Sequence, residues 1–202
     1  LSFSPYPDPP RRAIDVLSIG RRSPRSHSSL MRMSERTGMF YHYDTFKELL
    51  AHDLDEHRRL VANLAKRSRY FVVNPGKADT PGDTGGQFEF GYRYFEGAAS
   101  GTVMIGDHPK SEEFARFFDW EDAVIHVPFG SDDFDVAIEE LDRDPERLER
   151  IRTTNVVQSL RRHDWVYRWE TILKLVGLDS LPELPKRKRR LEAAAAALHG
   201  SA

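Results

Sequence analysis

The chain has 202 residues, no cysteine, and a net charge of −2 from 30 basic and 32 acidic side chains. This length fits one domain with a sizeable core, the charge balance gives no overall attraction to nucleic acid, and the lack of cysteine excludes disulfides and thiolate chemistry. No apolar run reaches the ~20 residues that a membrane-spanning helix needs, and no signal-peptide pattern opens the chain, so we expect a cytoplasmic protein.

Strand and helix patterns alternate along most of the chain, which is typical of a doubly wound, Rossmann-like α/β domain with a parallel sheet. Strands are expected at residues 14–19, 39–43, 69–73, 102–106 and 123–128. Helices are expected at residues 26–36, 54–65, 86–100 and 111–118, with C-terminal helices at 132–141, 145–162 and 165–175. Ser26 and Ser111 are the expected N-caps of two of these helices.

The two ends of the chain differ from this pattern. Residues 1–12 are expected to be a linker because prolines crowd the first ten positions. Residues 13–178 form the predicted domain, and residues 179–202 form a basic, alanine-rich tail. The tail contains KRKRR and an alanine run with high helix propensity but little to bury. Such a basic run contacts nucleic acid or a membrane surface, or is a solvated tail; the balanced charge elsewhere favours the tail.

Residues 86–107 are the most informative segment of the chain. They predict a helix that begins at a glycine, ends in small residues and is capped by Gly101, followed by a buried strand. Arg93 and Glu96 are three residues apart and therefore share a face of this helix. Because Asp107 follows the apolar strand directly, the strand is expected to be parallel, with its carboxyl end facing a ligand crevice.

Within this segment, FGYRYFEGAASG at residues 90–101 resembles the FG…R-x-F-E-A-A-A-C/S-G signature of group-1 glycosyltransferases. The nearest branch includes the spore-maturation glycosyltransferase-like proteins. The resemblance extends over about residues 14–176 and is sharp only in 86–107. Its members are two-domain GT-B enzymes, and the signature lies in their C-terminal, nucleotide-sugar-binding domain. It implies that this chain is the C-terminal half of a GT-B fold, beginning in the interdomain linker, since two such domains need a much longer chain.

The function that this resemblance implies is transfer of a sugar from a nucleotide diphosphate sugar to an unidentified acceptor. The N-terminal acceptor-binding domain would supply the usual general base, so no catalytic residue is assigned here and the isolated half is expected to be inactive. No metal or other cofactor is expected, because basic side chains and helix dipoles stabilise the leaving diphosphate. The alternatives are a non-catalytic nucleotide-sugar-binding or scaffold module, and a sugar-nucleotide epimerase of the same fold.

Glu96 is the candidate ribose ligand, because one carboxylate accepts hydrogen bonds from both ribose hydroxyls and the matching family residue has this role. Alternatively, Glu96 is an ordinary surface residue. Arg93 would neutralise the leaving phosphate, or it pairs with Glu89 or Glu96. Many relatives carry a second glutamate eight residues earlier, where this chain has Phe88. Glu89 is one residue later, about 100° around a helix, so neither its contact with the sugar nor a retaining mechanism is implied.

A diphosphate needs cations and backbone N–H groups. Gly20, Arg21, Arg22 and Arg25 follow the first strand, where doubly wound folds bind ligands, and arginine gives bidentate contacts to phosphate. Relatives carry Gly-Arg at this point and a further basic residue downstream. In this chain Arg25 or His27 would correspond to that basic residue. Alternatively, the turn is a solvated basic loop.

Two further segments are candidates for contact with the donor. Gly85 and Gly86 offer N–H groups at the start of the signature helix, or they only form a flexible loop. Asn74 opens the loop after the third strand, which is placed to line the base or sugar pocket. The charged residues of that loop are Lys77, Asp79 and Asp83. The histidines show no metal-ligand spacing, and His108, which follows a strand end, is assigned to structure or solvent.

Overall fold

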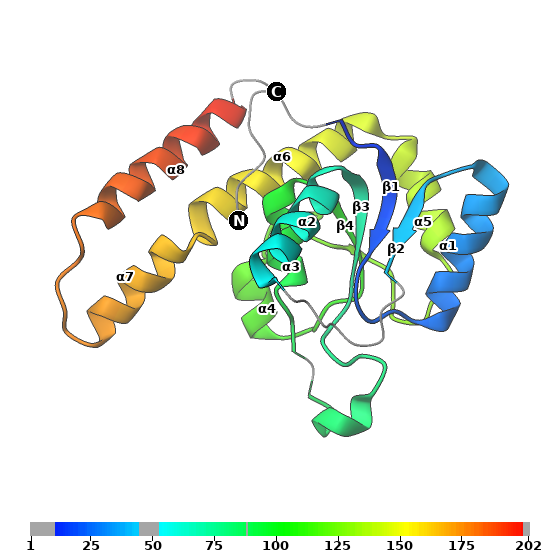
Figure 1. The fold of residues 1–202 in the computed structure, drawn as a ribbon, viewed down its shortest axis with the longest axis horizontal. Coiled ribbons are helices and arrows are strands. Elements are labelled where there is room, and N and C mark those ends of the chain that lie inside the picture. The colour runs from blue at the N-terminus through cyan, green and yellow to red at the C-terminus, as the bar shows by residue number, and fades with distance from the viewer. Residues whose placement is uncertain (1–10, 45–52, 88, 200–202) are drawn as a thin grey trace.

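The computed structural model describes residues 11–44, 53–87 and 89–199, in which five strands form one sheet in the order β2-β1-β3-β4-β5 (Figure 1). The strands are β1 (Ile14–Ser18), β2 (Tyr41–Tyr43), β3 (Ser68–Val73), β4 (Val103–Gly106) and β5 (Ile125–His126). All neighbouring strands run parallel. The doubly wound, Rossmann-like fold expected from the sequence is therefore confirmed.

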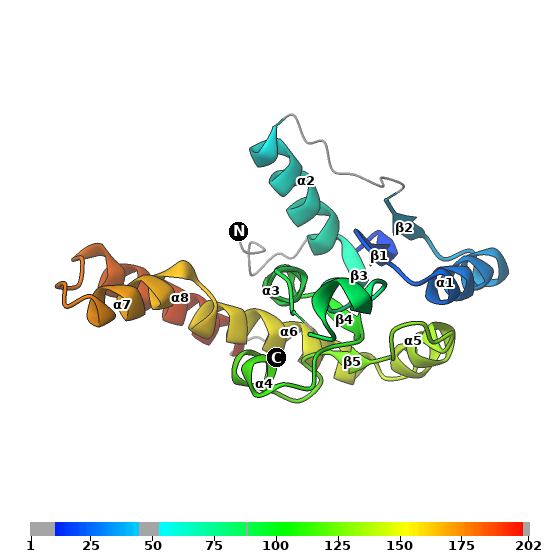
Figure 2. The same ribbon diagram turned by 90° about the horizontal axis from the view of Figure 1, so that it is seen from below.

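Helices cover both faces of this sheet. They are α1 (Pro24–Thr37), α2 (Leu54–Lys66), α3 (Arg93–Ser100), α4 (Glu112–Phe117), α5 (Phe134–Asp142), α6 (Pro145–Arg162), α7 (Trp165–Leu175) and α8 (Glu183–His199), with a 3₁₀ turn, η1 (Pro81–Thr84). Apolar residues of α1, α5 and the first half of α6 pack on one face, and those of α2, α3 and α4 pack on the other. Figure 2 shows α1 and α5 together, away from α2 and α3.

The strands are apolar on both sides because side chains alternate between the two faces of a sheet. In β3, Tyr70 and Val72 belong to the cluster under α1 and α5, whereas Phe71 and Val73 belong to the cluster under α2 and α3. All four are almost fully buried. The continuous apolar run that predicted a buried parallel strand thus supplies both halves of the core.

Several predicted boundaries shift by a few residues. Helix α1 begins at Pro24, two residues before the expected cap at Ser26, because proline is favoured in the first helical turn. The hydroxyl of Ser26 instead donates to the carbonyl of Ser131. Ser111 does cap α4, accepting a hydrogen bond from the N–H of Phe114. Strand β5 has two residues in place of the six expected.

The basic, alanine-rich segment is not a solvated tail within the described residues. It forms helix α8, which packs along α6 and buries Leu184, Leu191, Ala195 and Leu198. The three leucines recur every seven residues and so form one stripe. The prediction failed because that stripe is narrow and lies among charged and alanine residues.

Most of the predicted linker, residues 1–10, lies outside the described residues. Arg12 of that linker is bound to the domain: its guanidinium donates to the carbonyl oxygens of Ser68 and Gly101 at 2.7 and 2.6 Å. Arg12 thereby joins the start of β3 to the end of α3, and we count it as part of the domain.

Candidate functional site

The strand order places a topological switch point between β1 and β3. From β1 the chain passes through α1 to β2 on one side, and it then returns through α2 to β3 on the other side. Doubly wound sheets bind ligands at the carboxyl ends of the strands at such a point. The loops that meet there follow Ser18 and Val73, so the structure brings the turn at Gly20 and the loop that opens at Asn74 to one edge. The two loops touch, because Arg21 donates to Asp79 at 2.8 Å.

The turn after β1 has the geometry of an anion site. Gly20 has a φ of +93°, a conformation that favours glycine, and its N–H donates to a carboxylate oxygen of Asp44 at 2.8 Å. Helix α1 starts four residues later, and the Ser23 side chain makes no capping hydrogen bond to it. A glycine turn followed directly by the N-terminus of a 14-residue helix is an arrangement suited to phosphate binding.

Each arginine of this turn already has an acidic partner from another loop. The pairs are Arg21–Asp79 at 2.8 Å, Arg22–Asp44 at 2.9 Å and Arg25–Asp132 at 3.2 Å. The turn is therefore locally neutral and is not a free basic loop. The sequence did not predict the roles of Asp44 and Asp132, because both residues are distant in the chain from the arginines that they pair with.

The three pairs differ in how firmly they are held. Those of Arg21 and Arg25 are exposed, and exposed pairs contribute at most about 1 kcal/mol, so a phosphate can replace the carboxylate. Arg22 and Asp44 are each only 22% exposed, and the Arg22 guanidinium also lies 4.9 Å from the centre of the Tyr43 ring. Arg22 is thus a structural residue more than a ready phosphate ligand.

Arg93 and Glu96 share a face of α3, as predicted, and form an ion pair at 2.6 Å. Both lie in the first turn of this helix, whose N-terminus is at the carboxyl edge of the sheet. Their side chains are 22% and 18% exposed, so the pair is partly shielded from water. Arg93 binds Oε2 of Glu96, and among the described residues Oε1 accepts no hydrogen bond. One carboxylate oxygen is held and the other is available.

Small residues let α3 lie against the sheet. A side chain at Gly97 would place its Cβ 2.7 Å from Met104, and one at Gly101 would meet Val156 at 2.8 Å. Gly101 has a φ of +64° and caps the helix, as expected. Gly106 ends β4, where a Cβ would lie 2.0 Å from the carbonyl oxygen of Val73. The small residues of the signature therefore fix the position of Glu96 through close packing.

Gly85 and Gly86 do not open this helix, contrary to the prediction. They form a turn with φ values of +59° and +80° after η1, and α3 starts only at Arg93. Between the turn and the helix, Glu89 forms an isolated antiparallel bridge with Gly76, whose N–H donates to the Glu89 carbonyl at 2.6 Å. Glu89 therefore is not on α3, and the helical rotation argued for it does not apply.

Asn74 lies at the end of β3, at the switch point. Its side-chain oxygen Oδ1 is buried and accepts no hydrogen bond from the described residues. Buried polar atoms nearly always have a partner. This oxygen is therefore a candidate acceptor for a donor group of a ligand.

The ends of β4 and β5 carry a second polar group, which the sequence did not predict. Asp107 Oδ1 lies 3.2 Å from Nε2 of His126, and Oδ2 accepts from the N–H of Phe129 at 3.1 Å. His108 stacks on Phe114 with ring centres 4.8 Å apart, which fits its assignment to structure. The adjacency of the two strands was the available signal, because it places Asp107 and His126 at one edge.

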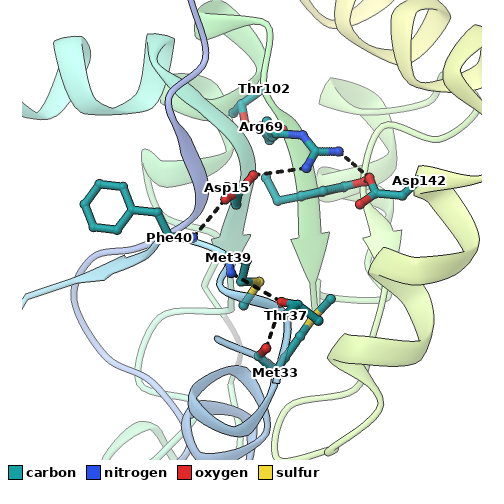
Figure 3. Close-up of polar contacts among 9 residues, drawn as sticks. Asp15, Met33, Thr37, Met39, Phe40, Arg69, Thr102 and Asp142 are labelled. Carbon is teal, nitrogen blue, oxygen red and sulfur yellow. Dashed lines mark hydrogen bonds and ion pairs between the residues drawn. The ribbon is translucent and has the colours of Figure 1, made fainter. Parts of the chain in front are cut away.

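A cavity of about 490 Å³ lies at the opposite, amino-terminal end of β1 and β3. Figure 3 shows that Arg69 there joins Asp15 of β1 to Asp142 at the end of α5. The Tyr70 hydroxyl also donates to Asp142, at 2.6 Å. Because these charged groups are all paired, we assign the cluster to holding α5 on the sheet.

Fold and site together define a doubly wound α/β domain whose candidate site lies at the β1/β3 switch point. The family described as Glycosyl transferase-like has a model that matches residues 50–174, more than half of the chain, and the chain belongs to this family. No curated protein matches the chain. The matched segment includes Asn74, Gly85, Gly86, Arg93 and Glu96, whereas the turn after β1 precedes it.

Two kinds of feature are absent from the described residues. None of the helices there is both long and apolar enough to cross a bilayer. No three His, Asp or Glu side chains of that part of the chain gather in a way that would hold a metal ion.

Proposed function

We propose that this domain binds a nucleotide diphosphate sugar and is the donor-binding part of a glycosyltransferase. The observation that carries the proposal is the Arg93–Glu96 pair in the first turn of α3, inside the family-matched segment. The domain would be the C-terminal half of a cytoplasmic, group-1 GT-B enzyme of the spore-maturation-like branch. It would act with an N-terminal acceptor-binding domain.

In this proposal Glu96 accepts hydrogen bonds from the ribose hydroxyls through its available oxygen. Arg93 holds the carboxylate in one orientation through the ion pair at 2.6 Å. A carboxylate that is already fixed loses little conformational entropy on binding. Arg93 therefore acts in the proposal as a positioning residue for Glu96, and contact with the leaving phosphate is secondary.

The diphosphate would lie over the turn after β1. The start of α1 faces this edge, and Arg21 and Arg25 exchange their exposed aspartate partners for phosphate oxygens. Fixed donors of this kind stabilise the charge that develops on a leaving diphosphate, with no need for a metal ion. The buried Oδ1 atom of Asn74 would accept a hydrogen bond from the base or the sugar.

Titration calorimetry with UDP and GDP tests the ribose assignment. Glu96→Gln should weaken the diphosphate that binds by about 1–3 kcal/mol, the loss of charge-assisted hydrogen bonds. Glu140→Gln, at an exposed position of α5, is the matched control and should bind as the unchanged chain does. Equal affinity in the Glu96 variant would refute the ribose role, and no binding of either diphosphate would refute the donor site.

A second measurement addresses the two-domain arrangement. If acceptor and general base belong to another domain, residues 1–202 should bind donor and transfer nothing. Release or transfer of a labelled sugar by this chain alone would contradict that arrangement and would place the catalytic groups here.

A further inference from the structure

Exposed apolar side chains concentrate on α7 and on the segment that follows it. Seven of the twelve large apolar residues that are exposed in the described part of the chain lie between residues 165 and 181. They are Trp165, Trp169, Ile172, Leu175, Val176, Leu178 and Leu181. Helix α7 and α8 extend away from the sheet in both Figure 1 and Figure 2, so this surface is not part of the sheet's core. Clustered exposed apolar groups of this kind mark an interaction site.

Four of these residues form a regular stripe, which we call the α7 seam: Trp165, Trp169, Ile172 and Val176. Their exposed fractions are 66%, 50%, 42% and 62%. Their spacing of four, three and four residues is that of a coiled-coil seam, which packs against another helix. The α7 seam is distinct from the face that covers the domain, because Val166 and Leu173 supply the contacts with the α6–α8 cluster.

The pattern does not fit a lipid surface well. A helix that lies in a membrane interface has a broad apolar face and an unpaired basic face, whereas the α7 seam is narrow. Basic residues beside it are paired within the chain, as shown by Lys186–Glu183, Arg187–Asp164 and Lys188–Glu170. These pairs neutralise part of the positive charge beside the α7 seam.

We propose that the α7 seam is the contact between two copies of this chain. An aromatic side chain presents about 150–250 Å², so complete burial of the seam and of Leu175, which is 80% exposed, would cover on the order of 500 Å² per copy. Two copies would bury on the order of 1,000 Å², the lower limit of a specific interface. A two-fold dimer uses the same surface patch on both chains, so the α7 seam needs no complementary surface elsewhere on the molecule.

This contact would adjoin the proposed donor site. The Arg168 guanidinium lies 5.5 Å from the Trp165 ring centre and 5.2 Å from that of Phe95. Phe95 is next to Glu96 on α3, so the α7 seam is joined to the helix that carries the Arg93–Glu96 pair. Pairing of two copies would place the second chain beside that helix.

Sedimentation velocity over about 1–100 μM chain, a range that spans affinities typical of small interfaces, tests the proposal. The unchanged chain should show a concentration-dependent dimer, and Trp169→Glu with Ile172→Glu should remain monomeric with an unchanged circular dichroism spectrum. Leu54→Glu with Leu60→Glu, at exposed apolar positions on α2, is the matched control and should dimerise normally. A monomer at all concentrations, or a dimer lost only in the α2 variant, would overturn the proposal.

The lack of native cysteine allows a direct test of proximity. Ile172→Cys should give an oxidised, disulfide-linked dimer, while Val136→Cys on α5, also exposed, should not. Equal cross-linking at both positions would overturn the assignment of the seam. So would a monomeric chain that binds anionic vesicles through Trp169. Donor binding is measured separately, so failure here leaves the proposed function untouched.

Discussion

His163 provides a pH-dependent test of how the helical layer is assembled. It follows α6, and its ring packs against Phe95 and Phe118 with ring centres 5.0 and 5.2 Å away. Both ring nitrogens are buried. Burial, aided by the positive charges of Arg162 and Arg168, lowers the pKa of His163 from its ordinary 6.5 to about 4.

The direction of the effect follows from the two states. In the unfolded chain His163 takes up a proton below about pH 6.5, whereas in the folded protein it stays neutral down to about pH 4. The neutral ring therefore makes its full contribution to the free energy of unfolding above pH 6.5. This contribution is lost as the pH falls toward 4. Linkage gives a loss of about 2 kcal/mol between pH 7.5 and pH 5, and about 3 kcal/mol by pH 4.

Urea titrations at pH 7.5 and pH 5 measure this loss. His163→Phe keeps an aromatic ring in the cluster and cannot be protonated, so the difference in unfolding free energy between the two pH values should shrink by about 2 kcal/mol. His57→Gln, on α2, should leave that difference as it is in the unchanged chain. If His163→Phe retains the full pH dependence, the ring is not buried neutral in the folded protein and the packing of α6 on α3 and α4 is wrong.

Other predictions follow from packing and from the charged turn. Leu191→Ala should lower the unfolding free energy by about 2–3 kcal/mol, because Leu191 is only 7% exposed. A negligible change in a urea titration would instead show that α8 does not pack on α6 and that this segment is a solvated tail. Gly106→Ala should prevent normal folding, seen by circular dichroism, because its Cβ would meet the Val73 carbonyl oxygen at 2.0 Å; a folded variant would contradict the close approach. Asp79→Asn should tighten UDP binding several-fold and leave uridine unchanged in calorimetry, because it frees Arg21 from its exposed ion pair; equal effects on both would show that phosphate binds elsewhere.

The candidate site was only partly predictable from the sequence. The shared face of Arg93 and Glu96 depends on helical spacing alone, and the placement of Gly20 after a strand depends on the alternating pattern, so both were correct. The start of α3 was wrong because Glu89 pairs with Gly76 across a loop. A local pattern carries no information about such a contact.

Sequence alone determined the parallel, two-faced sheet, because runs such as residues 70–73 are apolar at every position and must be buried on both sides. It also determined the caps at Gly101 and Ser111, which depend on neighbouring residues. Only the tertiary structure decided which carboxylates neutralise the basic turn, since Asp44 and Asp132 are 22 and 107 residues from their arginine partners. It likewise decided that α8 packs on α6 while the α7 seam stays exposed, because two apolar stripes of similar spacing are distinguished only by the surface each one meets.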